Sequence, residues 1–305
     1  GKKNEIKLEV TDRIDEISYA SGYAHHPIGG ILRDVTVYAL PENYVYNFFA
    51  ETLLDENYEN ADLRLSYSTT GNARISFKLI DKATGKVKFE KSDIAANKGN
   101  NEHLFKIDNP SLWDAEHPNL FLLKVDLYSE SGTYSFEKEI GFRKIEIKGD
   151  RMFVNGKQVK LRGACRHDIH PTLGRTTNNE LDSLDAVLFK KSNMNFVRTS
   201  HYPPTENFLK YCDREGLYVE CETAIAFVET YRQKNYAPGN TQNDSTYTDR
   251  YLGQLKEMVA TSRSHASVLF WSIGNESVYG KNFQLSYDWL KAEDKTRPVI
   301  FSYPG

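Results

Sequence analysis

The 305-residue sequence has little cysteine, a small net charge and no long apolar run. Its three cysteines, Cys165, Cys212 and Cys221, lack metal-site spacing and are too few for a disulfide framework, so we interpret them as core thiols. A net charge of −3 gives no electrostatic reason to expect nucleic acid or an anionic membrane as a partner. The sequence also lacks the run of about 18 apolar residues that would span a bilayer.

Several catalytic motifs are missing as well. The chain has no G-x-S-x-G elbow, no phosphate-binding glycine loop, no H-E-x-x-H and no C-x-x-C. These absences argue against serine-hydrolase, nucleotide-binding, zinc-protease and thiol-redox chemistry. No signal peptide opens the chain, but we expect the chain to be an excerpt of a longer protein, so the compartment stays undecided.

The first 145 or so residues carry strand signals and almost no helical ones. Alternating polar and apolar residues predict short strands, separated by turn residues such as Thr84-Gly85-Lys86. The predicted strands are 6–10, 35–38, 74–80, 86–89, 120–128 and 134–140. The spacing within residues 41–146 is typical of an antiparallel β-sandwich of immunoglobulin type. We assign residues 97–101 to a turn.

From residue 147 onward, strand and helix patterns alternate. A hairpin with an Asn155-Gly156 turn comes first. Strands are predicted at 160–164, 195–198, 218–222, 268–273 and 299–302, with helices opening near Thr177 and at 206–215, 249–263 and 283–293. Such alternation is typical of a parallel sheet. Residues 147–305 therefore read as about the first five strands of a (β/α)8 barrel.

The fourth of these strands ends at Asn275-Glu276 after an apolar run. In a (β/α)8 barrel, catalytic side chains lie at the carboxyl ends of the strands. A carboxylic acid there, beside an amide, is suited to act as general acid and base on a glycoside. Taken alone, the dipeptide is more often a polar cap on an ordinary strand.

Two longer segments resemble the signatures of glycoside hydrolase family 2, the β-galactosidase, β-glucuronidase and β-mannosidase group. The first includes Asn195-Phe196-Val197-Arg198-Thr199-Ser200-His201-Tyr202-Pro203-Pro204 and continues to Val219; the second, 263–276, ends in Glu276. The resemblance extends from about residue 17 to the end. It implies a multidomain fold, an all-β immunoglobulin-like sandwich followed by the first part of an α/β TIM barrel. Because Gly29-Gly30-Ile31-Leu32-Arg33-Asp34-Val35 resembles a closing strand of the family's N-terminal sugar-binding jelly-roll sandwich, residues 1–40 would be the tail of that domain.

The resemblance also implies roles for individual residues. Glu276 would be the general acid/base, and the substrate-binding candidates are Asn275, His201, His167 and Asp168. Arg198 and Glu222 would support them, and Trp271 reads as core rather than as a sugar platform. The family's nucleophile is a glutamate on the seventh strand, so it would lie outside this chain. Glu293, the one glutamate after Glu276, sits in a charged helical stretch that we interpret as a solvated face.

The sequence departs from the best-known galactosidases at their magnesium site. Where those enzymes carry Glu-Thr-His after the third strand, this chain has Ala226-Phe227-Val228, so we expect no metal and no cofactor. Cys221-Glu222-Thr223-Ala224 is instead similar to the Asp-Glu-Thr-Ala of β-glucuronidases, which work without metal. The identity of the sugar therefore stays open.

The favoured hypothesis is a retaining exo-β-glycosidase that hydrolyses terminal β-galactosides by double displacement. The 305-residue chain alone is expected to be inactive, because it lacks the nucleophile strand. Its partner would be a carbohydrate, and a homo-oligomer is an option for the full-length enzyme. Two alternatives remain: a β-glucuronidase of the same family, and a non-catalytic carbohydrate-binding protein, which the missing nucleophile would favour.

Overall fold

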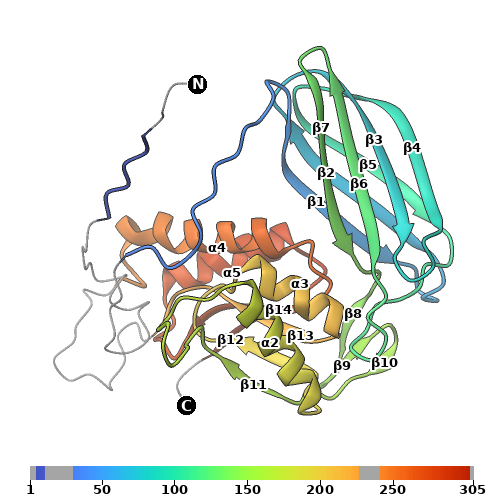
Figure 1. Cartoon of the computed structure of the whole chain (residues 1–305). Coiled ribbons are helices and arrows are strands. Elements are labelled where there is room, and N and C mark those ends of the chain that lie inside the picture. The colour runs from blue at the N-terminus through green and yellow to red at the C-terminus, as the bar shows by residue number, and fades with distance from the viewer. Residues whose placement is uncertain (1–4, 11–29, 227–240, 303–305) are drawn as a thin grey trace.

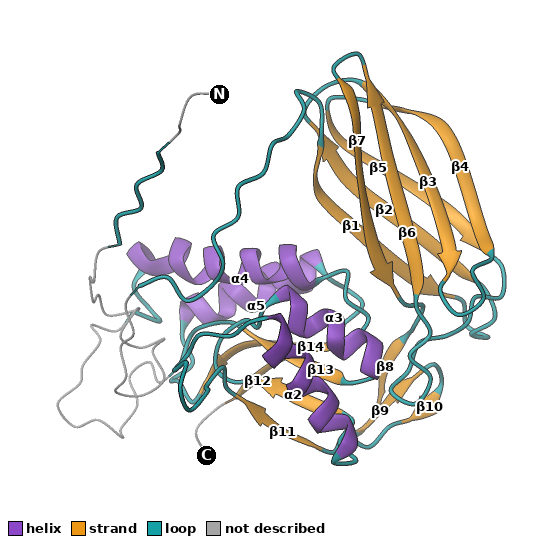
Figure 2. Cartoon of the chain, viewed as in Figure 1, coloured by secondary structure: helices purple, strands orange, loops and turns teal. Residues whose placement is uncertain are grey.

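The computed structural model describes residues 5–10, 30–226 and 241–302, in two units with a small β-ribbon where they meet (Figure 1). The first unit is a β-sandwich and the second is a curved parallel sheet covered by helices (Figure 2). The predicted fold class, an immunoglobulin-like sandwich followed by part of a barrel, is confirmed.

The sandwich consists of two antiparallel sheets, ordered β1-β2-β5 and β4-β3-β6-β7. Its strands are β1 (Val45–Leu54), β2 (Ala61–Thr69), β3 (Ala73–Asp81), β4 (Val87–Ala96), β5 (Gly99–Ile107), β6 (Phe121–Ser129) and β7 (Gly132–Ile140). Alternate side chains fill the space between the sheets, among them Leu63 and Leu65 of β2 and Leu123 and Val125 of β6, all fully buried. This period-two burial is the reason that the alternating segments fold as strands.

The ribbon at the junction contains β8 (Ile145–Lys148), β9 (Arg151–Val154) and β10 (Lys157–Gln158). The predicted hairpin turn is confirmed: Asn155 and Gly156 link β9 to β10, with φ of +51° and +73°. Two consecutive positive φ values are the geometry of a type I′ turn, which Asn-Gly favours.

The α/β unit has five parallel strands in the order β11-β12-β13-β14-β15. Its elements are β11 (Gly163–Arg166), α2 (Asn179–Lys191), β12 (Phe196–Thr199), α3 (Glu206–Glu215), β13 (Tyr218–Glu222), the 3-10 turn η1 (Ser245–Tyr247), α4 (Thr248–Ser262), β14 (Val268–Asn275), α5 (Lys281–Glu293) and β15 (Val299–Ser302). The predicted helices and parallel strands are confirmed within a few residues at each end. Side-chain oxygens cap two helices, Asn178 on α2 and Thr205 on α3.

Alternate residues of the parallel strands face opposite ways. Val197, Val219, Cys221 and Trp271 pack in one buried cluster with residues of α2 to α5. Trp271 is fully buried and its Nε1 donates to Asp294 Oδ2 at 2.8 Å, so its assignment to the core is confirmed. Side chains on the other face of the sheet, which is the inner face of a barrel, are left to form the candidate site.

Buried contacts join the two units. Trp113, in the loop between β5 and β6, is fully buried, and its Nε1 donates to the carbonyl oxygen of Asp213 at 2.8 Å. Its ring meets that of Tyr218 edge to face, with centroids 5.7 Å apart. Lys190 donates to the carbonyl oxygens of both Ala115 and Gly216. The sandwich therefore rests on α2, α3 and β13 through specific hydrogen bonds.

The two predicted N-terminal strands are wrong. Residues 6–10 and 35–38 form no strand, although their residues alternate. Ile6 is 66% exposed and Val37 is 73% exposed, so the apolar side chains have no sheet or core to pack on. A strand needs a hydrogen-bonded partner, and these segments have none among the described residues. Residues 1–4 and 11–29 of the predicted domain tail lie outside the described residues.

The cysteine interpretation is right for two of the three thiols. Cys212 and Cys221 are buried, but Cys165 is exposed. Cys165 pairs in register with Arg198, which places it on the inner face of β11, at the edge of the described sheet, where no further strand covers it.

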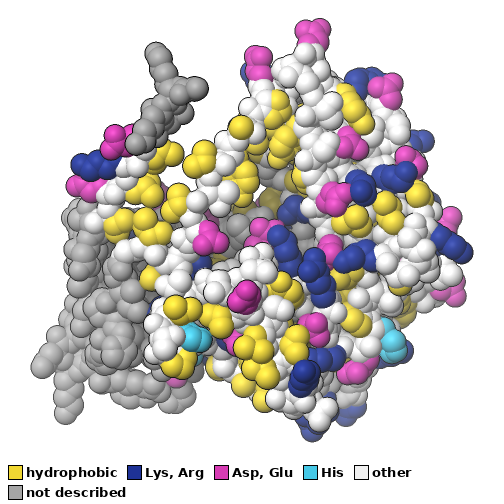
Figure 3. Space-filling view, viewed as in Figure 1, with side chains coloured by type: hydrophobic (Ala, Val, Ile, Leu, Met, Phe, Trp, Pro, Cys, Tyr) yellow, Lys and Arg dark blue, Asp and Glu magenta, His cyan; other side chains and the backbone are white. Residues whose placement is uncertain are grey.

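The surface shows charges of both signs. On the face in Figure 3, lysine and arginine side chains alternate with aspartate and glutamate, without a broad patch of one sign. Of the helices that the structure describes, none has the length and apolar character needed to cross a membrane.

We predict that Gly216→Ala destabilises the chain. Gly216 ends α3 with φ +73°, and an added Cβ would lie 2.3 Å from the carbonyl oxygen of Ala115. The left-handed backbone and the clash together should lower the free energy of unfolding by at least about 2 kcal/mol. Gly253→Ala is the matched control, since that helical site has open space and should gain up to about 1 kcal/mol. Urea unfolding of both variants checks this; equal midpoints would contradict it.

Candidate active site

The candidate site is organised around Arg198 on the inner face of β12. Its Nη2 donates to Asn275 Oδ1 at 2.7 Å and to Ser302 Oγ at 3.0 Å, and its Nε donates to Glu222 Oε2 at 3.1 Å. One guanidinium thus joins the carboxyl ends of β12, β13, β14 and β15. Its planar set of donors is suited to holding several acceptors at fixed angles.

Glu222, at the end of β13, is fully buried. Besides Arg198, it accepts a hydrogen bond from Ser272 Oγ at 2.6 Å, and its Oε1 lies 2.6 Å from His201 Nδ1. A buried carboxylate with three donors has its oxygens satisfied and is held in one orientation. Glu222 is therefore suited to orient Arg198 and His201, as expected from the sequence, rather than to attack a substrate.

Two histidines from neighbouring loops meet beside Glu222. The rings of His167 and His201 pack edge to face, with centroids 5.4 Å apart. Because Nδ1 of His201 faces a carboxylate, it carries the hydrogen, which directs Nε2 away from Glu222. Burial, followed by the charges of His201 and Arg175, lowers the pKa of His167 to about 4. His167 is therefore neutral near neutral pH and can both donate and accept a hydrogen bond.

Asn275 and Glu276 occupy the carboxyl end of β14. Arg198 fixes Oδ1 of Asn275, while the buried Nδ2 has no hydrogen-bond partner among the residues that the structure describes. Glu276 is half-buried and has φ +37°, a left-handed conformation that is uncommon for a residue with a side chain. Unpaired buried donors and strained backbone are both concentrated at functional sites.

Asp168 lies apart from this cluster. Its buried carboxylate forms ion pairs with Arg166 and with Arg33 of the N-terminal segment, and its backbone N–H donates to Tyr202 Oη at 2.7 Å. Both carboxylate oxygens therefore face arginines. This position favours a part in holding the loop that carries His167 over the direct substrate contact expected from the sequence.

The structure adds residues that sequence reasoning missed. Ser272 and Ser302 give no signal in the sequence, because only the register of the sheet places Ser272 beside Glu222 and Ser302 beside Arg198. Glu220 could have been found, since it lies two residues before Glu222 on one strand and must share its face. Glu220 is buried, and its Oε1 lies 2.9 Å from Arg198 Nε.

Side chains that could hold a metal ion are not grouped together in the described part of the chain. Within it, no group of three His, Cys, Asp or Glu side chains is placed to hold a metal ion. Ala226 is described, whereas Phe227 and Val228 lie outside the described residues. The absence of a galactosidase-type magnesium site stays a prediction.

We predict that Glu220 makes the stability of the chain depend on pH. Burial, opposed by Arg198 and reinforced by Glu222, raises the pKa of Glu220 from 4.5 to about 7. Between these values the folded state binds more protons at Glu220 than the unfolded state does, so the contribution of Glu220 to stability is fully present below about pH 4.5 and is lost as the pH rises through 7. The shift corresponds to about 3 kcal/mol.

Glu220→Gln should remove the loss of stability that accompanies deprotonation of Glu220. The variant should therefore gain stability relative to the parent between pH 4 and pH 8, as measured by denaturant unfolding. Glu59→Gln changes an exposed carboxylate on the sandwich and should follow the parent at every pH. Parallel pH curves for the parent and Glu220→Gln would overturn the assignment.

Comparison with known sequences places the chain in a family. The family model described as "Glycosyl hydrolases family 2, TIM barrel domain" matches residues 145–304, and "Glycosyl hydrolases family 2" matches residues 43–143. A β-galactosidase of Lactococcus lactis is 35% identical over 294 residues, which are 95% of this chain and 28% of the relative. A β-galactosidase of Vibrio cholerae is 34% identical over 292 residues, 91% of this chain and 28% of the relative. The chain thus spans under a third of these relatives.

Solved structures share the fold. A β-glucuronidase of Parabacteroides merdae superposes with a TM-score of 0.83 at 23% identity, covering 94% of this chain and 37% of that one. A β-D-glucuronidase of Dictyoglomus thermophilum gives a TM-score of 0.80 at 22% identity, covering 100% of this chain and 51% of that one. At these identities the likeness concerns the fold alone, but the two family models together cover nearly the whole chain. The chain belongs to glycosyl hydrolases family 2.

Proposed function

We propose that this chain is part of an exo-acting, retaining β-glycosidase that hydrolyses terminal β-galactosides. The observation that carries the proposal is the carboxyl end of β14, where Glu276 follows an asparagine whose Oδ1 is fixed by Arg198 and whose Nδ2 is unpaired. The sugar assignment is supported by relatives at 34–35% identity that are named β-galactosidases.

In this proposal Glu276 donates a proton to the leaving oxygen and later removes one from the attacking water. Asn275 Nδ2 donates to the sugar 2-hydroxyl, a contact that strengthens in the transition state. His201, oriented by Glu222, and neutral His167 bind the sugar beside it. Arg198 keeps the amide of Asn275 turned so that Nδ2, rather than Oδ1, faces the substrate.

The nucleophile would come from a later barrel strand, outside this chain. A retaining enzyme places its two carboxyl groups about 5–5.5 Å apart. Glu222 is already bound by three donors, and Glu293 lies on α5 in an ion pair with Arg263. Neither is suited to attack, so we propose that the 305-residue chain alone is inactive. Because Ala226-Phe227-Val228 replaces the galactosidase metal motif, we also propose that the reaction needs no magnesium ion at that site.

Glu276→Gln provides the test of the acid/base role. In a protein extended through all eight barrel strands, the variant should lose about 10²- to 10⁴-fold in kcat/KM on substrates with poor leaving groups, because proton donation is lost. Dinitrophenyl glycosides need little protonation and should lose far less. Steady-state kinetics on both substrates measures the difference, with Glu293→Gln as a control that should match the parent. Equal losses on both substrates would sink the assignment.

A β-glucuronide is the second candidate substrate, because Cys221-Glu222-Thr223-Ala224 is similar to the corresponding segment of β-glucuronidases. Aryl β-galactoside and aryl β-glucuronide should be offered to this chain and to the extended protein. We expect hydrolysis of the galactoside by the extended protein only. Preference for the glucuronide would change the sugar but keep the reaction. A folded extended protein that binds sugars without hydrolysing either would instead be a carbohydrate-binding protein.

A further inference from the structure

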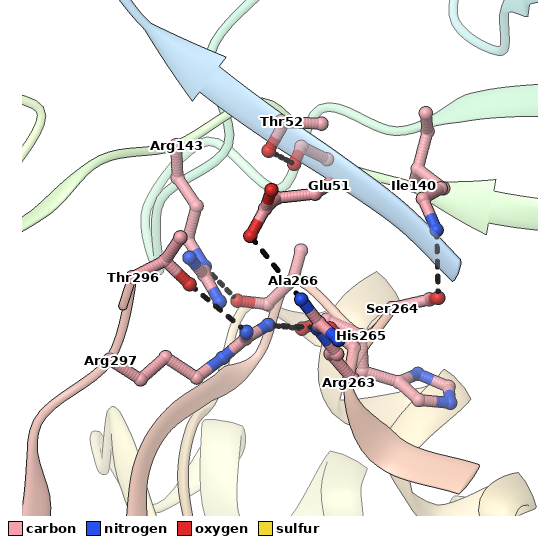
Figure 4. A pocket seen from close by; sticks show the side chains of 12 residues that line it. Glu51, Thr52, Ile140, Arg143, Arg263, Ser264, His265, Ala266, Thr296 and Arg297 are labelled. Carbon is pink, nitrogen blue, oxygen red and sulfur yellow. Dashed lines mark hydrogen bonds and ion pairs between the residues drawn. The ribbon is translucent and has the colours of Figure 1, made fainter. Parts of the chain in front are cut away.

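A small cavity lies where the sandwich meets the α/β unit, away from the candidate active site. It has a volume of about 20 Å³ and is lined by the end of β1, the segment after β7, and the loops before β14 and β15. Three arginine side chains converge on it, Arg143 from the segment after β7, and Arg263 and Arg297 from the α/β unit (Figure 4). A space of this size holds one water molecule or one monatomic ion.

Arg143 is the unusual member of this group. It is 5% exposed, and it donates from Nε to the carbonyl oxygen of Ala266 and from Nη2 to that of Val268, the latter at 2.7 Å. Within the described ranges, no carboxylate forms an ion pair with it. A guanidinium has five N–H donors and keeps its proton in proteins, so a full charge lies buried with neutral acceptors only.

The surrounding charges offset that of Arg143 only in part, because Asp294 and Asp213 favour its charged form while Arg297 disfavours it. Arg297 lies close enough to disfavour it, and with burial as the larger cause it lowers the pKa of Arg143 to about 9. The nearest acidic groups are already paired: Asp294 with Arg297 at 2.8 Å, and Asp213 with His265. Burying a charge without a counter-charge is strongly unfavourable.

The other two arginines complete the cationic lining. Arg297 donates to the carbonyl oxygens of Val268, Arg263 and His265. Arg263 pairs with Glu293 at 2.7 Å, yet its Nε is buried and makes no hydrogen bond in the described part of the chain. Glu51 is the acidic group that lines the cavity, and it already pairs with Arg64 at 2.6 Å and with Arg263 at 3.6 Å.

We propose that this cavity binds one monatomic anion of chloride size. The anion would accept hydrogen bonds from Arg143 of the connecting segment and from Arg263 or Arg297 of the α/β unit, and it would supply the counter-charge that Arg143 lacks. A water molecule would fit but would neutralise nothing. Bound there, the ion joins the sandwich to the α/β unit.

The first experiment is thermal unfolding of this chain in sodium chloride, sodium bromide and sodium gluconate at equal ionic strength. A ligand that binds only the folded state raises its stability, so chloride and bromide should raise the Tm by about 2–4 °C over gluconate. Arg143→Met should lose this difference. Arg74→Gln removes an exposed arginine on the sandwich and should keep it. Equal Tm values for the parent in all three salts would overturn the proposal.

The second measurement does not depend on whether Arg143→Met folds. Crystals of the parent chain grown or soaked in bromide should show one anomalous peak in the cavity, beside Arg143 and either Arg263 or Arg297. Bromide peaks confined to the outer surface, with water in the cavity, would overturn the proposal. A peak in the cavity without any salt effect on Tm would also contradict the stabilising role inferred for the ion.

Discussion

The charge of a guanidinium that cannot lose its proton is the constraint on which this structure depends. At Arg198 the charge lies beneath the candidate site, and the backbone must bring acceptors to it from three other strands. Acceptors are likewise held beside two other arginines: Asp168 pairs with Arg166 below the loop after β11, and main-chain carbonyl oxygens accept from Arg143 at the domain junction. Because these acceptors sit at set angles, the register of the parallel sheet and the direction of Asn275 follow from them.

Much of the α/β unit could be predicted from the sequence because its segments are strongly periodic and carry end signals. The range Glu206–Glu215 was predicted without error, since Thr205 caps the helix and Gly216 ends it. The sandwich was harder. Strands β1, β2 and β5 were missed, and Asn100 and Asn101 were assigned to a turn although β5 begins at Gly99. Alternation shows that a segment can form a strand, but pairing decides whether it does, as residues 35–38 demonstrate.

The candidate site shows the same division. Arg198, Glu222, His201 and Asn275 were predicted as one set because of the resemblance to the family, and the fold brings them together. Ser272 and Ser302 could not be predicted, since a one-residue change in register would turn either serine to the other face. The pairing of Asp168 with Arg33 was also beyond the sequence, as 135 positions separate the two residues.

The contact between Trp113 and Asp213 has a consequence for how such proteins can be recombined. The indole of Trp113 donates to a main-chain carbonyl oxygen in the last turn of α3, so any residue at position 213 can accept the hydrogen bond. The donor, by contrast, requires a tryptophan side chain in the sandwich. When sandwich domains are exchanged among relatives, this hydrogen bond therefore restricts the residue at position 113 of the sandwich but not the residue at position 213 of the barrel. A chimera that keeps an indole at position 113 retains the joint, whatever residue the acquired barrel carries opposite it.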